Sequence, residues 1–164
     1  MDLLDRLSRI TGTVTAWLTL VMVIVTTVIV ILRYVFDAGF IWLQESVTWM
    51  HAAVFMLGAS YTLLNEEHVR VDIFYRSMSE VRRAWVDFLG VLIFLLPLCA
   101  YLAYVSWDFA ATSWSIRESS REPGGLAYPL ISIIKSVVVL MPVAVALQGI
   151  SLLLRSLARI RGRR

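Results

Sequence analysis

The sequence predicts an all-α integral membrane protein with four transmembrane helices. Three observations lead to this prediction. The 164 residues are 59% hydrophobic and only 16% charged, whereas soluble domains carry about 25% charged residues. The apolar residues form four blocks, each long enough to cross about 30 Å of hydrocarbon as a helix. Basic residues gather at the ends of those blocks, where anionic lipid headgroups and membrane insertion favour them.

The four blocks predict a single membrane domain that covers 1–164, with no sizeable soluble part. The first block has no charge, and no small-residue cleavage site follows it, so we expect a retained anchor rather than a signal peptide. The second block is the most polar. The predicted spans are about 10–32, 41–64, 85–107 and 130–154.

The distribution of Lys and Arg predicts the orientation. Eleven of the fifteen basic residues lie in the two tails and in the loop between the second and third spans, and four lie on the other side. The positive-inside rule therefore predicts that both termini and the middle loop are cytoplasmic. Within that loop, apolar residues alternate loosely with charged ones between 70 and 82, which predicts a short amphipathic helix on the membrane surface.

Glu45 is the first candidate functional residue, because a carboxylate inside a span costs free energy unless it is solvated, paired or protonated. It lies near the predicted outer surface, and Arg33 ends the preceding span on the same side. An Arg33–Glu45 pair that closes the first helical hairpin is the favoured interpretation. A contact with a partner subunit and a proton-coupling site are the alternatives.

His51 belongs to a stripe of polar and small residues on the second span. Gln44, Thr48, His51, Phe55 and Gly58 fall on one helical face. Because small residues let helix backbones approach closely, we expect this stripe to face protein rather than lipid. A hydrogen-bonded packing role for His51 is the favoured interpretation.

No cofactor and no catalytic activity are expected. The sequence lacks a Walker loop, a GxSxG motif and zinc-type His/Cys spacing. Haem or metal ligation by His51 is poorly supported, because the only other histidine, His68, lies toward the opposite membrane face. The single cysteine, Cys99, lies in an apolar run, where we expect it to pack. The net charge of +3 is explained by the basic residues at the ends of the apolar blocks, near the lipid headgroups. We therefore expect no nucleic-acid binding.

Three residues in the last two spans have ordinary interpretations. Lys135, at the entrance of the fourth span, can extend outward to the membrane surface, and a substrate contact is the alternative. Asp87 is expected in the first turn of the third span, and Pro97 is expected to kink that span.

Several stretches, spread in order over nearly the whole chain, carry a family resemblance. They are RYVF at 33–36, WLQE at 42–45, GA at 58–59, HVRVD at 68–72, SWSIRES at 113–119, GL at 125–126, Lys135 and LQG at 147–149. Together they resemble the small permease subunit (DctQ type) of the tripartite ATP-independent periplasmic (TRAP) transporters. The HVRVD stretch is the most specific of them.

The resemblance implies a function and partners. TRAP systems combine a small subunit with a large permease subunit, which holds the substrate and sodium sites, and with a periplasmic substrate-binding protein. They import organic acids across the bacterial inner membrane, driven by a sodium gradient. The small subunit is then a scaffold without a transport site of its own, in contact with membrane lipid. The residues expected at subunit interfaces or in structural roles are Arg33, Trp42, Glu45, His51, Gly58, His68, Arg70, Asp72, Arg117, Glu118 and Lys135.

Two rival functions remain open. The chain could be a self-sufficient, proton-coupled transporter that uses Glu45 as its titrating acid. Transport by the purified chain alone, abolished by Glu45→Gln, would identify that function. It could also be a membrane redox or haem subunit, which an absorption spectrum with a Soret band would identify.

Overall fold

A computed structural model describes residues 2–65, 75 and 77–162 of the chain. Four helical segments are long and apolar enough to cross a membrane. The predicted all-α fold with four candidate spans is therefore confirmed. The elements are α1 (Asp2–Val35), α2 (Ile41–Leu64), α4 (Glu80–Gly90), the π-helical turn η1 (Val91–Leu95), α5 (Leu96–Ser115) and α6 (Leu130–Ile160).

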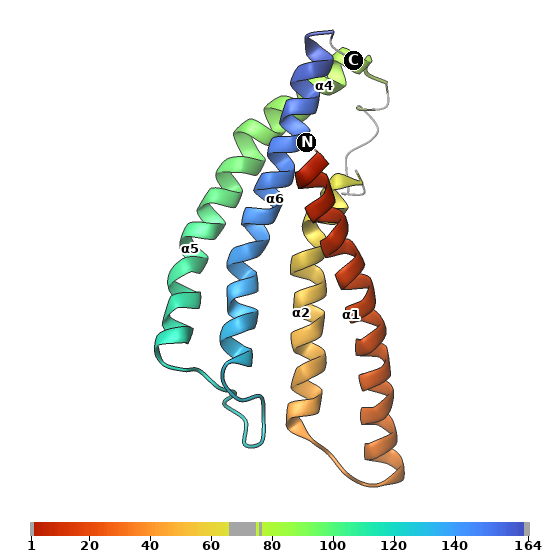
Figure 1. The fold of residues 1–164 in the computed structure, drawn as a ribbon, viewed down its shortest axis with the longest axis vertical. Coiled ribbons are helices and arrows are strands. Elements are labelled where there is room, and N and C mark those ends of the chain that lie inside the picture. The colour runs from red at the N-terminus through yellow and green to blue at the C-terminus, as the bar shows by residue number, and fades with distance from the viewer. Residues whose placement is uncertain (1, 66–74, 76, 163–164) are drawn as a thin grey trace.

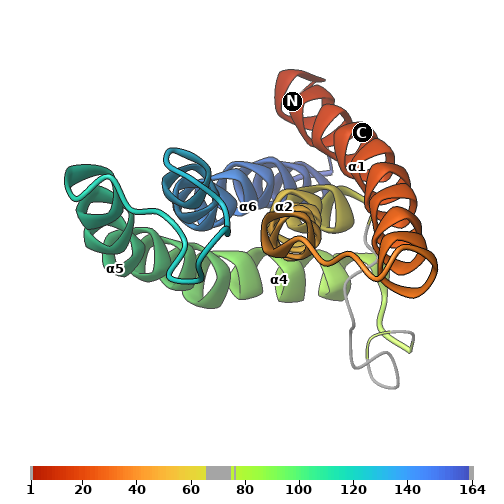
Figure 2. The ribbon, with the colours of Figure 1, turned by 90° about the horizontal axis from the view of Figure 1, so that it is seen from below.

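The helices form two hairpins that meet along α2 and α6. Figure 1 shows α1 beside α2 and α5 beside α6, and the view from below places α2 and α6 between α1 and α5 (Figure 2). Two loops, 36–40 and 116–129, lie at one end of the molecule, which we call the loop end. Both termini and α4 lie toward the opposite end, the terminus end (Figure 1). This arrangement is what four membrane crossings require.

The third span differs most from its prediction. Its helical structure runs from Glu80 to Ser115, about two turns beyond the predicted end at position 107. Asp87 consequently lies in the interior of α4 rather than in a first turn, and its Oδ2 accepts a hydrogen bond from the Tyr75 hydroxyl at 2.8 Å. Pro97 lies in the first turn of α5, directly after η1. Because proline has no N–H to donate, a wider helical turn at this point is expected.

Small residues allow the helices to pack closely at two crossings. A Cβ atom on Gly12 of α1 would lie 2.4 Å from Cδ2 of Tyr61 on α2, and one on Gly149 of α6 would lie 2.8 Å from Cδ2 of Leu95. Cys99 is buried in the same apolar core as Leu63 and Val145, which agrees with its predicted packing role. Residues 70–74 and 76 of the amphipathic helix predicted between 70 and 82 lie outside the described part of the chain, and α4 begins at Glu80.

Candidate functional site: two polar clasps and an exposed polar face

Glu45 joins the start of α2 to the loop between α5 and α6. Its Oε1 accepts a hydrogen bond from Ser120 Oγ at 2.5 Å, and its Oε2 accepts one from the Leu126 N–H at 2.7 Å. The backbone N–H of Trp42 donates to the Gly124 carbonyl at 3.1 Å. We call the set Glu45, Ser120, Gly125 and Leu126 the loop clasp, because it fixes the long loop against α2.

Gly125 makes this geometry possible. A Cβ atom at this position would lie 2.4 Å from Ser120 Oγ and 2.6 Å from Glu45 Oε2, which is closer than any side-chain carbon can approach. The Ser120 N–H also donates to the Leu126 carbonyl at 2.8 Å. The loop therefore folds tightly around the carboxylate, and only glycine fits between its two hydrogen-bond donors.

Lys135 and Glu118 form a second link at the loop end. Lys135 Nζ lies 2.5 Å from Glu118 Oε2 and 4.1 Å from the centroid of the Phe109 ring. Only 19% of the Lys135 side chain and 20% of the Glu118 side chain are exposed. Hydrogen bonds from Lys135 and from the Ser113 side chain lower the pKa of Glu118. Lys135 is thus paired within the chain, in place of the free extension to the membrane surface that the sequence suggested.

Arg117 provides the turn that leads into this pair. It has a left-handed φ of 49° directly after α5. The Glu118 N–H donates to the Ser113 carbonyl at 3.0 Å and the Arg117 N–H to the Trp114 carbonyl at 3.3 Å, which is the Schellman pattern of helix termination. The position usually held by glycine in this motif is held here by an exposed arginine.

A polar cluster near the terminus end was not predicted. Asp5 Oδ1 accepts hydrogen bonds from Gln148 Nε2 at 3.3 Å and from Ser151 Oγ at 3.2 Å, and Asp5 Oδ2 pairs with Arg155. Ser8 Oγ donates to Gln148 Oε1 at 2.9 Å. We call these five residues the terminus clasp, since they join α1 to α6. The spacing of Gln148, Ser151 and Arg155 on one helical face was the available sequence signal.

The polar stripe of α2 is largely uncovered by the described part of the chain, and its residues Thr48 and His51 border a groove against α1. Gln44, Thr48, His51 and Phe55 are exposed, and a Cβ atom on Gly58 would meet no atom within 4 Å. The His51 ring lies beside the Phe55 ring, at 4.7 Å between centroids. The predicted hydrogen-bonded packing of His51 and close packing at Gly58 are therefore not found among the described residues.

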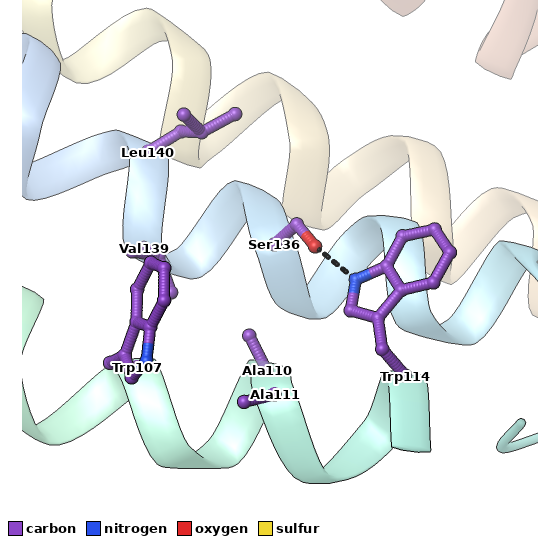
Figure 3. A pocket seen from close by; sticks show the side chains of 7 residues that line it. All are labelled: Trp107, Ala110, Ala111, Trp114, Ser136, Val139 and Leu140. Carbon is purple, nitrogen blue, oxygen red and sulfur yellow. Dashed lines mark hydrogen bonds between the residues drawn. The ribbon is translucent and has the colours of Figure 1, made fainter. Parts of the chain in front are cut away.

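A separate groove of about 320 Å³ lies between α5 and α6, toward the loop end (Figure 3). The Trp114 Nε1–H donates to Ser136 Oγ at 2.8 Å across it, so the indole N–H is satisfied. Within the described residues, no group of three or more His, Cys, Asp or Glu side chains could hold a metal ion. The groove is lined by Trp107, Ala110, Ala111, Trp114, Ser136, Val139 and Leu140.

The family model of the DctQ component of tripartite ATP-independent periplasmic transporters matches residues 22–159. The chain belongs to this family. The match includes the whole loop clasp and the Glu118–Lys135 pair, whereas Asp5 and Ser8 of the terminus clasp precede it. No curated protein and no solved structure matches the chain.

The DctQ resemblance drawn from the sequence is thereby confirmed, but one predicted contact is wrong. The predicted Arg33–Glu45 pair is not found among the described residues, and the two oxygens of Glu45 accept hydrogen bonds from Ser120 and Leu126 instead. Arg33 is exposed instead and lines a shallow pocket at the loop end together with Asp37 and Gln44.

Apart from Arg33, His51 and Gly58, described above, the predicted site residues form two groups. Glu45, Arg117, Glu118 and Lys135 all contribute to holding the long loop at the loop end, and Trp42 contributes its backbone N–H while its side chain is exposed. The remaining three, His68, Arg70 and Asp72, lie outside the described residues, and their interface roles stay predictions.

Proposed function

We propose that this DctQ-family chain is the small scaffold subunit of a sodium-coupled, ATP-independent TRAP transporter that imports an organic acid. It acts together with a large permease subunit and a periplasmic binding protein. The observation that carries this proposal is the family match over residues 22–159. Transport, substrate recognition and sodium coupling then reside in the partners.

The internal geometry supports a scaffold role. The loop clasp and the terminus clasp tie the two hairpins together toward opposite ends of the helices. Glu45, the acid that a proton-coupled transporter would use, already accepts two hydrogen bonds from a tightly folded loop. A carboxylate held in this way favours a structural role over a cycle of proton uptake and release.

The proposed location is the bacterial inner membrane, with both termini in the cytoplasm. The loop end then faces the periplasm, where the binding protein arrives. Asp37, Arg117, Arg121 and Glu122 are exposed there and offer charges of both signs for transient contact. On the cytoplasmic side, we propose that the 68–72 stretch fixes the middle loop against the large subunit or the lipid surface.

Co-purification tests the proposal. The chain is tagged, extracted from its native membrane in a mild detergent, and the proteins that come with it are identified. The expected result is a stoichiometric polytopic partner, and sodium-dependent uptake of an organic acid after reconstitution of both subunits with the binding protein. A stable homo-oligomer with no partner, which transports alone, would contradict the proposal.

The role of the 68–72 stretch has its own test. Substitution of His68, Arg70 and Asp72 by alanine should reduce recovery of the complex. If both assembly and uptake stay intact, this part of the proposal is wrong.

A further inference from the structure

Two polar side chains of α2 point outward within the membrane-spanning part of the helix. His51 lies ten residues after Ile41, about 15 Å into a helix about 36 Å long, and Thr48 lies one turn before it. Both are exposed, and neither side chain forms a hydrogen bond with any residue in the described part of the chain. Gln44, closer to the loop end, continues the same face.

Other exposed threonines show that an unbonded hydroxyl is not inevitable. Thr26 and Thr27 of α1 donate to the Met22 and Val23 carbonyls at 2.8 and 2.9 Å. Each of these hydroxyls is satisfied by its own helix. The Thr48 hydroxyl forms no such bond with the residues that the structure describes, so its hydrogen-bonding capacity remains available to a partner.

The side chains of Thr48 and His51 line a groove between α1 and α2. The groove has a volume of about 410 Å³. Phe55, which is 66% exposed, projects beside the His51 ring. The α1 wall of the groove is apolar except for Thr26 and Thr27, whose hydroxyls are bonded to their own helix. The α2 wall presents the Thr48 hydroxyl and the His51 imidazole, which have no hydrogen-bond partner among the described residues. The lining residues are Met22, Val23, Thr26, Thr27, Val47, Thr48 and His51.

Lipid chains cannot satisfy these groups. A hydrocarbon neighbour leaves the imidazole and the hydroxyl without hydrogen bonds, which costs free energy, whereas polar side chains on neighbouring membrane helices hydrogen-bond to one another. In the α5–α6 groove, by contrast, the Trp114 Nε1–H is already bonded to Ser136 (Figure 3).

We infer that the α1–α2 groove receives a transmembrane helix of the large permease subunit, with a hydrogen-bonding side chain opposite His51 and Thr48. This inference rests on the proposed function. Phe55 packs against the incoming helix. Gly58, one turn further along the face, lets that helix approach closely, because no atom of the described residues lies within 4 Å of a Cβ placed on Gly58.

Site-specific photocrosslinking in native membranes tests the inference. The photoreactive residue p-benzoylphenylalanine replaces Phe55 in one variant and Tyr104, which is 80% exposed on α5, in the other. We expect the Phe55 position to crosslink to the large polytopic subunit and the Tyr104 position not to.

The outcomes separate the inference from the proposed function, which co-purification decides independently. A crosslink from position 104 alone, with the partner still co-purifying, overturns the inference and leaves the proposed function intact. A crosslink from position 55 to a second copy of this chain, or none from position 55, overturns the inference whatever co-purifies.

Matched substitutions distinguish hydrogen bonding from shape. Thr48→Val and His51→Leu should each reduce recovery of the complex about threefold to tenfold, in line with membrane hydrogen bonds. Thr26→Val, in the same groove, should have no effect on recovery, because the Thr26 hydroxyl bonds to its own helix. Equal effects of Thr48→Val and Thr26→Val would contradict the predicted hydrogen bond.

A second matched pair tests close approach. Gly58→Leu should prevent assembly without unfolding the subunit, since a Cβ atom there meets no atom of the described residues within 4 Å. Gly90→Leu is the control, because a Cβ atom on Gly90 likewise has nothing within 4 Å. If both variants assemble normally, no partner helix lies against the α2 face.

Discussion

Glu45 shows how a carboxylate at the start of a membrane span can become a structural residue. The sequence indicates that such a carboxylate needs a partner, and the nearest basic residue along the chain is Arg33. Its actual donors, Ser120 and Leu126, lie 75 and 81 residues away. Helical periodicity carries no information about contacts over that separation, so the importance of Glu45 could be predicted and its partners could not.

Gly125→Ala should destabilise the subunit by about 1–3 kcal/mol, because the added methyl group would separate Glu45 from Ser120 and leave polar groups unpaired. Thermal unfolding of the purified subunit in detergent measures the effect. Gly39→Ala is the control, since a Cβ atom there meets nothing within 4 Å. Equal melting temperatures for the two variants would show that the loop clasp does not hold the fold together.

Glu118 should make stability depend on pH in acid. Its pKa in the folded state is lowered, first by the hydrogen bond from Lys135. A group with a lowered folded pKa stabilises the protein above its unfolded pKa, about 4.5, and that contribution is lost as the pH falls through the folded value. Melting temperatures measured between pH 7 and pH 3 should therefore fall less steeply for Glu118→Gln than for the wild type.

At the scale of helices, length and hydropathy predict the elements but not their ends. The predicted second span coincides with α2 at 41–64, because Asp37 and Gly39 interrupt the apolar sequence before it and polar residues follow it from Asn65. The third helix continues to Ser115 through Asp108, a residue that hydropathy alone treats as a boundary. Backbone hydrogen bonds extend the helix until a terminating motif, here the Schellman turn at Arg117, ends it. Hydropathy does not detect that turn.

The terminus clasp was missed for a related reason. Gln148, Ser151 and Arg155 occupy one face of α6, but their significance depends on the presence of Asp5 opposite, more than 140 residues earlier in the chain. Only the packing of α1 on α6 brings them together. Charges near helix ends are ordinarily assigned to lipid headgroups, and this assignment hid a contact between two helices.

Asp5→Ala should loosen the start of α1, because Asp5 accepts hydrogen bonds from three side chains of α6. We expect a loss of about 1–3 kcal/mol in stability and faster hydrogen exchange of backbone amides in residues 5–12. Arg155→Ala should add little to Asp5→Ala, since both remove the same contact. The control is Arg159→Ala, an exposed arginine one turn further on. Additive effects of Asp5→Ala and Arg155→Ala would contradict a shared cluster.

At the scale of the whole molecule, the two clasps explain how four helices with little buried core keep one arrangement. Most large side chains of α1 and α5 are exposed, as expected for helices with lipid or another subunit as neighbour. Lipid provides no hydrophobic force that drives helices together. Directional polar contacts toward each end of the bundle, with close packing at Gly12 and Gly149 beside the terminus clasp, supply the specificity that a water-soluble core would provide.

The orientation of the whole molecule gives the last prediction. Eleven basic residues in the two tails and the middle loop of the sequence, against four elsewhere, predict a cytoplasmic terminus end. In a Cys99→Ala background, cysteines introduced at exposed Asp37 and Glu122 should react with a membrane-impermeant maleimide in intact cells. A cysteine at Arg161 should react only after the membrane is permeabilised. The reverse pattern would place the loop clasp in the cytoplasm, out of reach of a periplasmic binding protein, and would remove the proposed role of the loop end while leaving the family assignment intact.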